Sequence, residues 1–253
     1  QERKEVALPA RAHGGVWRGI VVGMVALVFI SAGSPGMADR ALAWGRQAVA
    51  DGQYEQALRH FHTARALAPA SDSPFALGAE IRQAALANGG GSLEPEVQRT
   101  LFTQARRFLN QAQANNPVRA GIHVTRAQLF LAVPERLAAH GRARAQAELN
   151  RALAKDPRHL EARFALARLH QAAGRPQTAL NVLEAGLKWP YPRTQPVPLY
   201  LQTAMLRSRS GDEPGARALA RRAMERLPAD SKAADGIARH FGMTGEGGGH
   251  AAP

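Results

Sequence analysis

The side chains that support catalysis or metal binding in other proteins are scattered along this sequence rather than grouped. Among its nine histidines, His60 and His62 fall close together on one predicted helix but point in different directions, unlike the four-residue spacing of a zinc pair. The glycine run at residues 89–91 is not followed by the Lys-Ser/Thr of a phosphate-binding loop. There is no serine elbow, dinucleotide fingerprint or pair of catalytic carboxylates. The sequence therefore predicts neither an enzyme nor a cofactor or metal site.

The composition favours an all-helical protein without covalent cross-links. The chain of 253 residues has no cysteine, which removes disulfides, thiolate metal sites and thiol nucleophiles together. Hydrophobic residues make up 45% but aromatic residues only 6%, which suits closely packed helix pairs rich in alanine. Runs of β-branched residues are nearly absent outside residues 20–30, so a sheet is not expected.

The formal net charge of +13 raises the possibility of a nucleic-acid partner, bound by phosphate neutralisation. However, the basic residues are mostly arginines spread singly between alanines, without an RNA-binding motif and with few aromatic residues for base stacking. The sequence thus argues against nucleic acid. It favours acidic protein partners or anionic lipid surfaces.

The segment from Gly52 to Pro69 provides the pattern that organises the rest of the chain. Apolar residues recur in it at three- and four-residue spacing, which predicts one face of a helix. These residues are Tyr54, Ala57, Leu58, Phe61, Ala64 and Leu67. Gly52 suits a tight turn with positive φ before the helix, and Pro69 ends it. Ala57 and Ala64 share one face and are small, so a neighbouring helix can approach closely.

The two small residues and the closing position return along the chain at intervals typical of stacked helical hairpins. The further copies are Ala105, Ala112 and Pro117; Ala145, Ala152 and Pro157; Ala179, Gly186 and Tyr191; and Ala216, Ala223 and Pro228. The same internal spacing in each copy predicts that helix pairs repeat over most of the chain.

This pattern resembles the tetratricopeptide repeat (TPR), most clearly in the first copy, which has Trp44-Gly45 on the first helix. The resemblance covers about residues 38–230. It implies an all-α, right-handed superhelical solenoid of about five helical hairpins, which serves as a scaffold for binding proteins. The second copy departs through an insertion at residues 88–92. The third departs at Pro134, which is expected to begin an unusually long second helix.

Residues 19–33 form the only long apolar run. As a helix this run rises about 22 Å, and flanking residues extend it across a ~30 Å hydrocarbon core, which predicts a single transmembrane helix at residues 16–37. The alternative is a secretory signal peptide, with residues 36–38 as a small-residue cleavage site. The long polar leader before the apolar run favours an uncleaved anchor.

The basic residues around this segment predict its orientation. Arg3, Lys4, Arg11 and Arg18 precede it, whereas Arg40 is the only basic residue soon after it. The N-terminus is therefore expected in the cytoplasm and the repeats in the periplasm, at a bacterial inner membrane.

The span also carries a face of small residues. This face consists of Gly19, Gly23 and Ala26. It indicates either close packing against another membrane helix or only the glycine content that is common in such spans. The predicted organisation is a flexible tail at 1–15, the membrane helix at 16–37, the repeat domain at 38–241 and a disordered tail at 242–253.

The resemblance also implies a partner-binding groove, because the first helix of each hairpin lines the groove in TPR proteins. The positions carried over by it are Arg46, Val49, Phe75, Arg82, Arg126, Phe164, Arg168, Gln171, Leu201, Gln202 and Arg209. Arginines interleaved with apolar residues suit a peptide with acidic side chains or a free C-terminal carboxylate. The Lys/Asn carboxylate clamp of chaperone-binding members is not matched.

Together these features predict a single-pass membrane protein whose periplasmic repeats hold or assemble other proteins in an envelope complex. One alternative is an assembly chaperone similar to the membrane-anchored repeat factors of cytochrome c maturation or of the secretion translocon. Another is a soluble repeat protein that is secreted after signal cleavage.

Overall fold

The computed structural model describes residues 36–192, 196–228 and 231–243. The predicted tail at 1–15 and nearly all of the predicted membrane helix, including Gly19, Gly23 and Ala26, lie outside these residues and stay predictions. No helix in the described ranges is long and apolar enough to cross a membrane.

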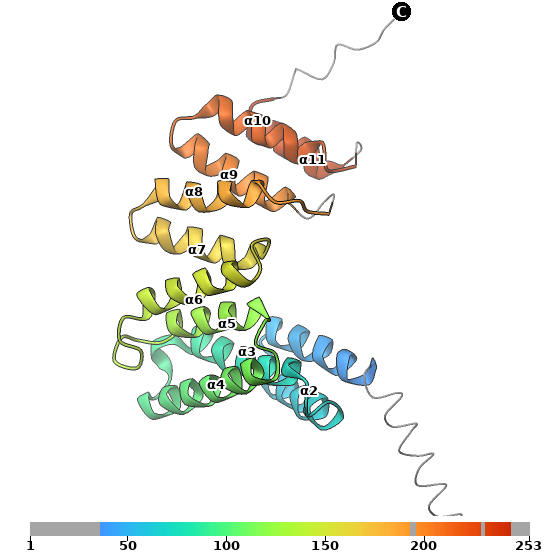
Figure 1. Ribbon diagram of the computed structural model, residues 1–253, viewed down its shortest axis with the longest axis vertical. Helices are drawn as coiled ribbons and strands as arrows, with labels where there is room; N and C mark the ends of the chain where they lie inside the picture. Colours follow the sequence, from blue (N-terminus) through green and yellow to red (C-terminus); the bar gives the residue numbers. More distant parts are fainter. Residues whose placement is uncertain (1–35, 193–195, 229–230, 244–253) are drawn as a thin grey trace, which may run out of the picture.

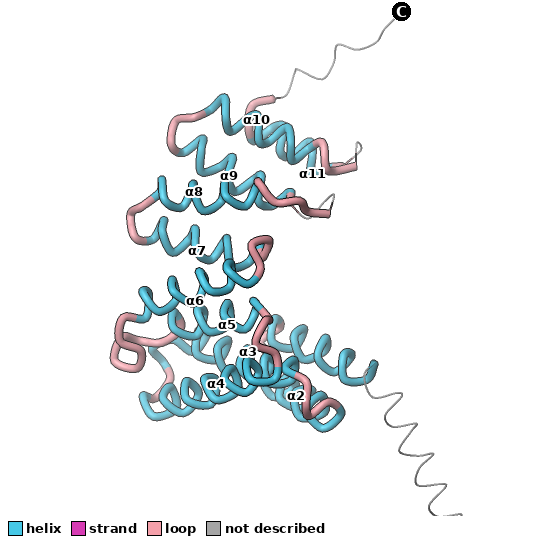
Figure 2. The backbone as a smooth tube through the Cα atoms, in the orientation of Figure 1, coloured by secondary structure: helices cyan, strands magenta, loops and turns pink. Residues whose placement is uncertain are grey.

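The described residues contain helices and no strands, which confirms the all-α prediction for this part of the chain (Figure 1, Figure 2). Residues 36–50 are helical. They are followed by α2 (Tyr54–Leu67), α3 (Asp72–Gly89), the 3₁₀ helix η1 (Gly90–Ser92), α4 (Pro95–Asn115), α5 (Ala120–Leu131), α6 (Gly141–Lys155), α7 (Leu160–Ala172), α8 (Pro176–Leu187), α9 (Val197–Arg209), α10 (Glu213–Met224) and α11 (Lys232–His240).

Consecutive helices pair as hairpins, and the hairpins stack along the long axis of the molecule (Figure 1). Each hydrophobic core cluster is built from both helices of one hairpin and the helix that follows them. Ala57 and Phe61 of α2, for example, share a cluster with Leu77 of α3. A stack of this kind is held together by contacts between neighbours rather than by one central core.

The small residues of the repeat pattern form the contact points between the helices. In α2, α4, α6 and α10 both alanines of the pattern are fully buried, with 0% of their surface exposed. These residues are Ala57, Ala64, Ala105, Ala112, Ala145, Ala152, Ala216 and Ala223. Close approach of neighbouring helices at these positions explains why the chain uses alanine there so regularly.

Helix α8 has Gly186 at the second small position, and a neighbouring side chain explains the exchange. A Cβ atom at Gly186 would collide with the Cδ and Nε atoms of Arg163. Arg163 crosses this gap because its Nη1 and Nη2 atoms donate hydrogen bonds to the carbonyl oxygens of Val182 (2.7 Å) and Pro157 (2.5 Å). The glycine therefore makes room for a buried guanidinium group.

The turns within the hairpins follow the sequence only in part. Gly52 has a φ of 73°, as its place before α2 predicts, and Gly174 and Gly211 adopt the same left-handed conformation in the fourth and fifth hairpins. In the third hairpin the left-handed residue is His140, with a φ of 56°.

The predicted long helix beginning at Pro134 is wrong. Residues 132–140 form a loop, and α6 begins at Gly141. The amides of Leu137 and Ala138 donate to the carbonyl oxygen of Pro134, and Glu135 Oε1 accepts from the amide of His140 at 2.6 Å. Ala138 packs into the core cluster of α3 and α4, so tertiary burial outweighs the local preference for helix.

The last helix, α11, covers the exposed end of the stack. Ser231 caps its N-terminus, and Ile237 packs against α9 and α10 together with Phe241. Met243, which the sequence places in the C-terminal tail, joins the same cluster, so the fold continues slightly beyond the predicted boundary at residue 241.

The role of the small residues is tested by replacing Ala57 with arginine. Ala57→Arg would overpack a contact with no free space and bury an unpaired charge, so we expect the free energy of unfolding to fall by about 3 kcal/mol or more. Urea unfolding followed by circular dichroism measures the change. Ala66→Arg, on the exposed side of the same helix, is the control, and equal stability of the two variants would contradict the repeat pattern.

Candidate functional site

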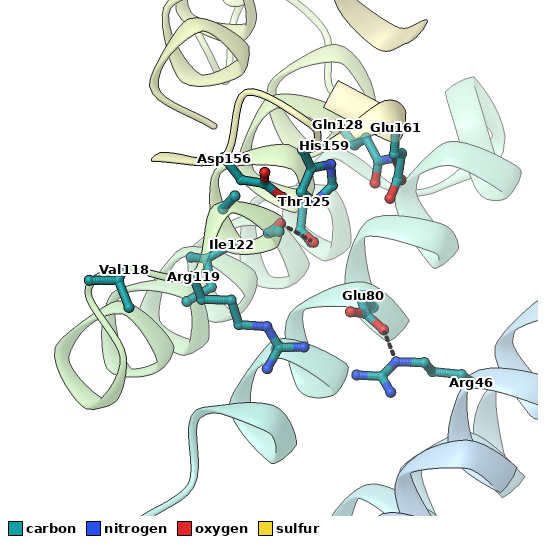
Figure 3. Close-up of a pocket in the computed structure, with 13 residues that line it drawn as sticks. Arg46, Glu80, Val118, Arg119, Ile122, Thr125, Gln128, Asp156, His159 and Glu161 are labelled. Carbon is teal, nitrogen blue, oxygen red and sulfur yellow. Dashed lines mark hydrogen bonds and ion pairs between the residues drawn. The ribbon is translucent and has the colours of Figure 1, made fainter. Parts of the chain in front are cut away.

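Among the hollows that the described residues form, two bring together the first helices of successive hairpins. The larger, here called the N-terminal pocket, encloses about 660 Å³ between the helix at residues 36–50, α3, α5 and the start of α7 (Figure 3). Its polar lining consists of Arg46, Glu80, Arg119, Thr125, Gln128, Asp156, His159 and Glu161.

Most charges of the N-terminal pocket are already paired with each other or with neighbours. Arg46 Nε lies 3.3 Å from Glu80 Oε2, and Arg119 binds Asp72. On the opposite wall, Gln128 Nε2 donates to Glu161 Oε1 at 2.9 Å (Figure 3). A ligand that displaced these pairs would forfeit the interactions it replaced. The pocket therefore has little uncommitted charge.

His159 adds one directed polar group to this wall. Its Nδ1 atom caps α7 by accepting a hydrogen bond from the amide of Ala162 at 3.3 Å. This cap places the proton of the neutral ring on Nε2, which can donate to a bound group. Within the described residues no group of three His, Asp or Glu side chains is placed to hold a metal ion.

The smaller hollow, here called the C-terminal pocket, lies between α7 and α9 and encloses about 240 Å³. Its rim is formed by Arg168, Gln171, Gln202, Met205 and Arg209, and its floor by Ala167, Leu183 and Leu206. Four of the rim residues belong to the groove predicted from the sequence, and the structure brings these four together. Met205 was not part of that prediction, although it lies one helical turn from both Gln202 and Arg209.

The two arginines of the C-terminal pocket are uncommitted. Neither the Arg168 nor the Arg209 side chain forms a hydrogen bond or an ion pair with any residue that the structure describes. By contrast, Arg207 donates to Glu184 at 2.9 and 2.5 Å, and the hydrogen bond with Glu184 raises the pKa of Arg207. The C-terminal pocket therefore combines free guanidinium groups with an apolar floor, which suits a carboxylate next to an apolar group.

Two other predicted groove arginines lie between helices. Arg82 Nε donates to Gln104 Oε1 at 2.8 Å, and its guanidinium carbon lies 4.6 Å from the centre of the Phe108 ring. Arg126 Nη1 donates to Gln113 Oε1 at 2.8 Å. Burial lowers the pKa of both arginines. These two side chains fill gaps against α4 instead of pointing into either hollow.

The remaining predicted groove residues divide between the core and the N-terminal pocket. Phe75 is only 9% exposed and belongs to the core cluster of α3 and α4. Val49, Phe164 and Leu201 are half-buried and pack against neighbouring clusters. Arg46 alone joins the N-terminal pocket, so the predicted set does not form one continuous surface.

Arginines that pack between helices and arginines that are free at the C-terminal pocket should differ in their effect on stability. Arg82→Ala removes its hydrogen bonds and its contact with Phe108, so we expect a loss of about 2 kcal/mol in the free energy of unfolding. Arg168→Ala removes no such interaction and should change stability by less than about 0.5 kcal/mol. Urea unfolding of both variants makes the comparison, and similar losses would show that the assignment of roles is incorrect.

Comparison with known proteins agrees with this architecture. Residues 136–192 match the model of the tetratricopeptide repeat family, over α6 and the fourth hairpin (α7 and α8) rather than over the first copy, where the sequence pattern is clearest. Among curated proteins, no sequence matches the chain.

Two solved structures share the fold over most of the chain. A thermophilic TPR protein from Thermus thermophilus has a TM-score of 0.52 and 18% identity, and the match covers 81% of this chain and 97% of that protein. PilF from Pseudomonas aeruginosa has a TM-score of 0.51 and 16% identity, with 83% and 91% covered. The helical stack is therefore a TPR fold, and residues 136–192 belong to the tetratricopeptide repeat family.

Proposed function

We propose that this chain is a non-enzymatic scaffold that binds a protein partner at the C-terminal pocket. The observation that carries this proposal is the pair of uncommitted guanidinium groups, Arg168 and Arg209, above the apolar floor formed by Leu183 and Leu206. A partner segment with an acidic side chain or a C-terminal carboxylate beside an apolar residue satisfies both features. The amides of Gln171 and Gln202 supply further donors and acceptors on the rim.

The proposal includes a membrane anchor at residues 16–37, with the N-terminus in the cytoplasm and the repeats in the periplasm. The apolar run at residues 19–33 and the basic residues before it support this arrangement. An anchored scaffold of this kind would hold or assemble partners within a complex of the cell envelope.

The binding site is tested by the double variant Arg168→Glu/Arg209→Glu. Charge reversal should repel a carboxylate and abolish most partner recovery from detergent extracts, while helicity and melting temperature stay close to those of the parent. Recovery by the parent should also fall as salt is raised.

The control is Arg217→Glu/Arg222→Glu, which makes the same charge change on the exposed side of α10. Partners recovered with the parent are identified by mass spectrometry and measured with both variants. Equal loss with both variants would indicate a general charge effect, and no loss with the first would place the binding surface elsewhere.

The anchor is tested by fractionation of native membranes. An uncleaved apolar helix should keep the protein in the membrane during carbonate washing, and protease added to spheroplasts should degrade the repeats. A soluble chain beginning near Asp39 would instead indicate signal cleavage.

A further inference from the structure

The helix at residues 36–50 has one packed face and one bare face. Ala38, Ala41 and Leu42 are buried, the latter two in the core cluster of α2 and α3. On another side Met37 is 49% exposed and Trp44 is 59% exposed. Seven residues apart, they lie two turns from each other on one stripe of the helix. An isolated exposed apolar side chain is ordinary, but an aligned methionine and tryptophan form a surface.

Trp44 is held in place while most of its surface stays open. Its ring centre lies 5.7 Å from that of His60 on α2, which supports the indole from one side. Its indole N–H donates to no residue that the structure describes. An amphipathic ring with a free donor is typical of the boundary between lipid and water.

The sequence before this helix indicates what lies beside the bare face. The apolar run of the proposed anchor ends at residue 33, immediately upstream. Ser34 followed by Pro35 is typical of an N-cap and a first helical position. This pair therefore predicts that the membrane crossing, expected at residues 16–37, ends before Ser34 and that a separate helix starts there. A chain that leaves the bilayer and starts a new helix at this point can place that helix along the membrane surface.

We infer that the face formed by Met37, Arg40 and Trp44 lies on the bilayer surface, on the side that carries the repeats. Arg40 is exposed on the same stripe, three residues after Met37, where its guanidinium group can bind a lipid phosphate. This inference rests on the proposed membrane anchor and adds the orientation of the repeat stack to it.

The polar surroundings beyond Trp44 limit the contact to the first turns of the helix. A hollow of about 280 Å³ next to Trp44 is lined by Gln47, Asp51, Gln53 and Gln56. These groups favour water, so the helix meets the bilayer near Met37 and Trp44 and leaves it after them. The helix lies toward one end of the stack and α10 and α11 lie at the other (Figure 1).

The test uses the full chain with Trp17→Phe and Trp189→Phe, which leaves Trp44 as the only one of its three tryptophans. The protein is reconstituted in vesicles of phosphatidylcholine and phosphatidylglycerol, with or without bromine on the acyl chains. We expect blue-shifted Trp44 emission that the brominated lipids quench. The matched control keeps Trp189 alone, which is 44% exposed near the end of α8, and its emission should not be quenched.

Each other outcome overturns the inference in a distinct way. If the protein does not float with the vesicles, both the proposed anchor and this placement of the helix are wrong. If the protein floats but Trp44 emits as it does in water, the anchor is supported and the placement of this helix on the bilayer is wrong. Blue-shifted emission without quenching shows that protein covers this face, and equal quenching of Trp189 shows that another surface lies on the lipid.

Discussion

The close contact at small residues is the constraint on which the rest of the structure depends. The second helix of each hairpin presents alanine or glycine where its neighbours cross, and the alanines at these positions have no exposed surface. Because every core cluster joins one hairpin to the next helix, the position of each first helix depends on the second helix before it. The C-terminal pocket shows the consequence: α8, seated through Ala179 and Gly186, supplies Leu183 to the floor between α7 and α9.

Some arginines of this chain pack between helices and others face solvent at a pocket, and both groups contribute to the formal charge of +13. Arg82, Arg163 and Arg207 fill gaps between helices, where planar guanidinium groups stack on aromatic rings or bind carbonyl and carboxylate oxygens. Arg168 and Arg209 instead face solvent at a hollow without a partner among the described side chains. The high arginine content therefore reflects packing as well as recognition, and the net charge alone does not locate a binding site.

The sequence predicts the helix pairs well because small residues and closing prolines recur at fixed spacing. It also predicts which residues share a helix face, as Arg168 with Gln171 and Gln202 with Arg209 show. It does not predict where a long side chain ends, since this depends on neighbours such as Gln104 and Phe108 beside Arg82. The loop after α5 escapes prediction for a similar reason: burial of Ala138 and the hydrogen bonds of Pro134 and Glu135 arise only in the folded stack.

The two pockets differ in a way that bears on selectivity. In the N-terminal pocket, Arg46, Arg119 and Gln128 already form ion pairs or hydrogen bonds with acidic side chains of the protein. A charged ligand would have to replace these interactions with similar ones, so its binding would gain little net free energy. In the C-terminal pocket no described group competes with a ligand carboxylate for the two guanidinium groups. The apolar floor also excludes water on one side, which strengthens a guanidinium–carboxylate bond relative to one on an open helix surface. Long-range attraction by the basic chain brings acidic partners near, and this local difference decides where they bind.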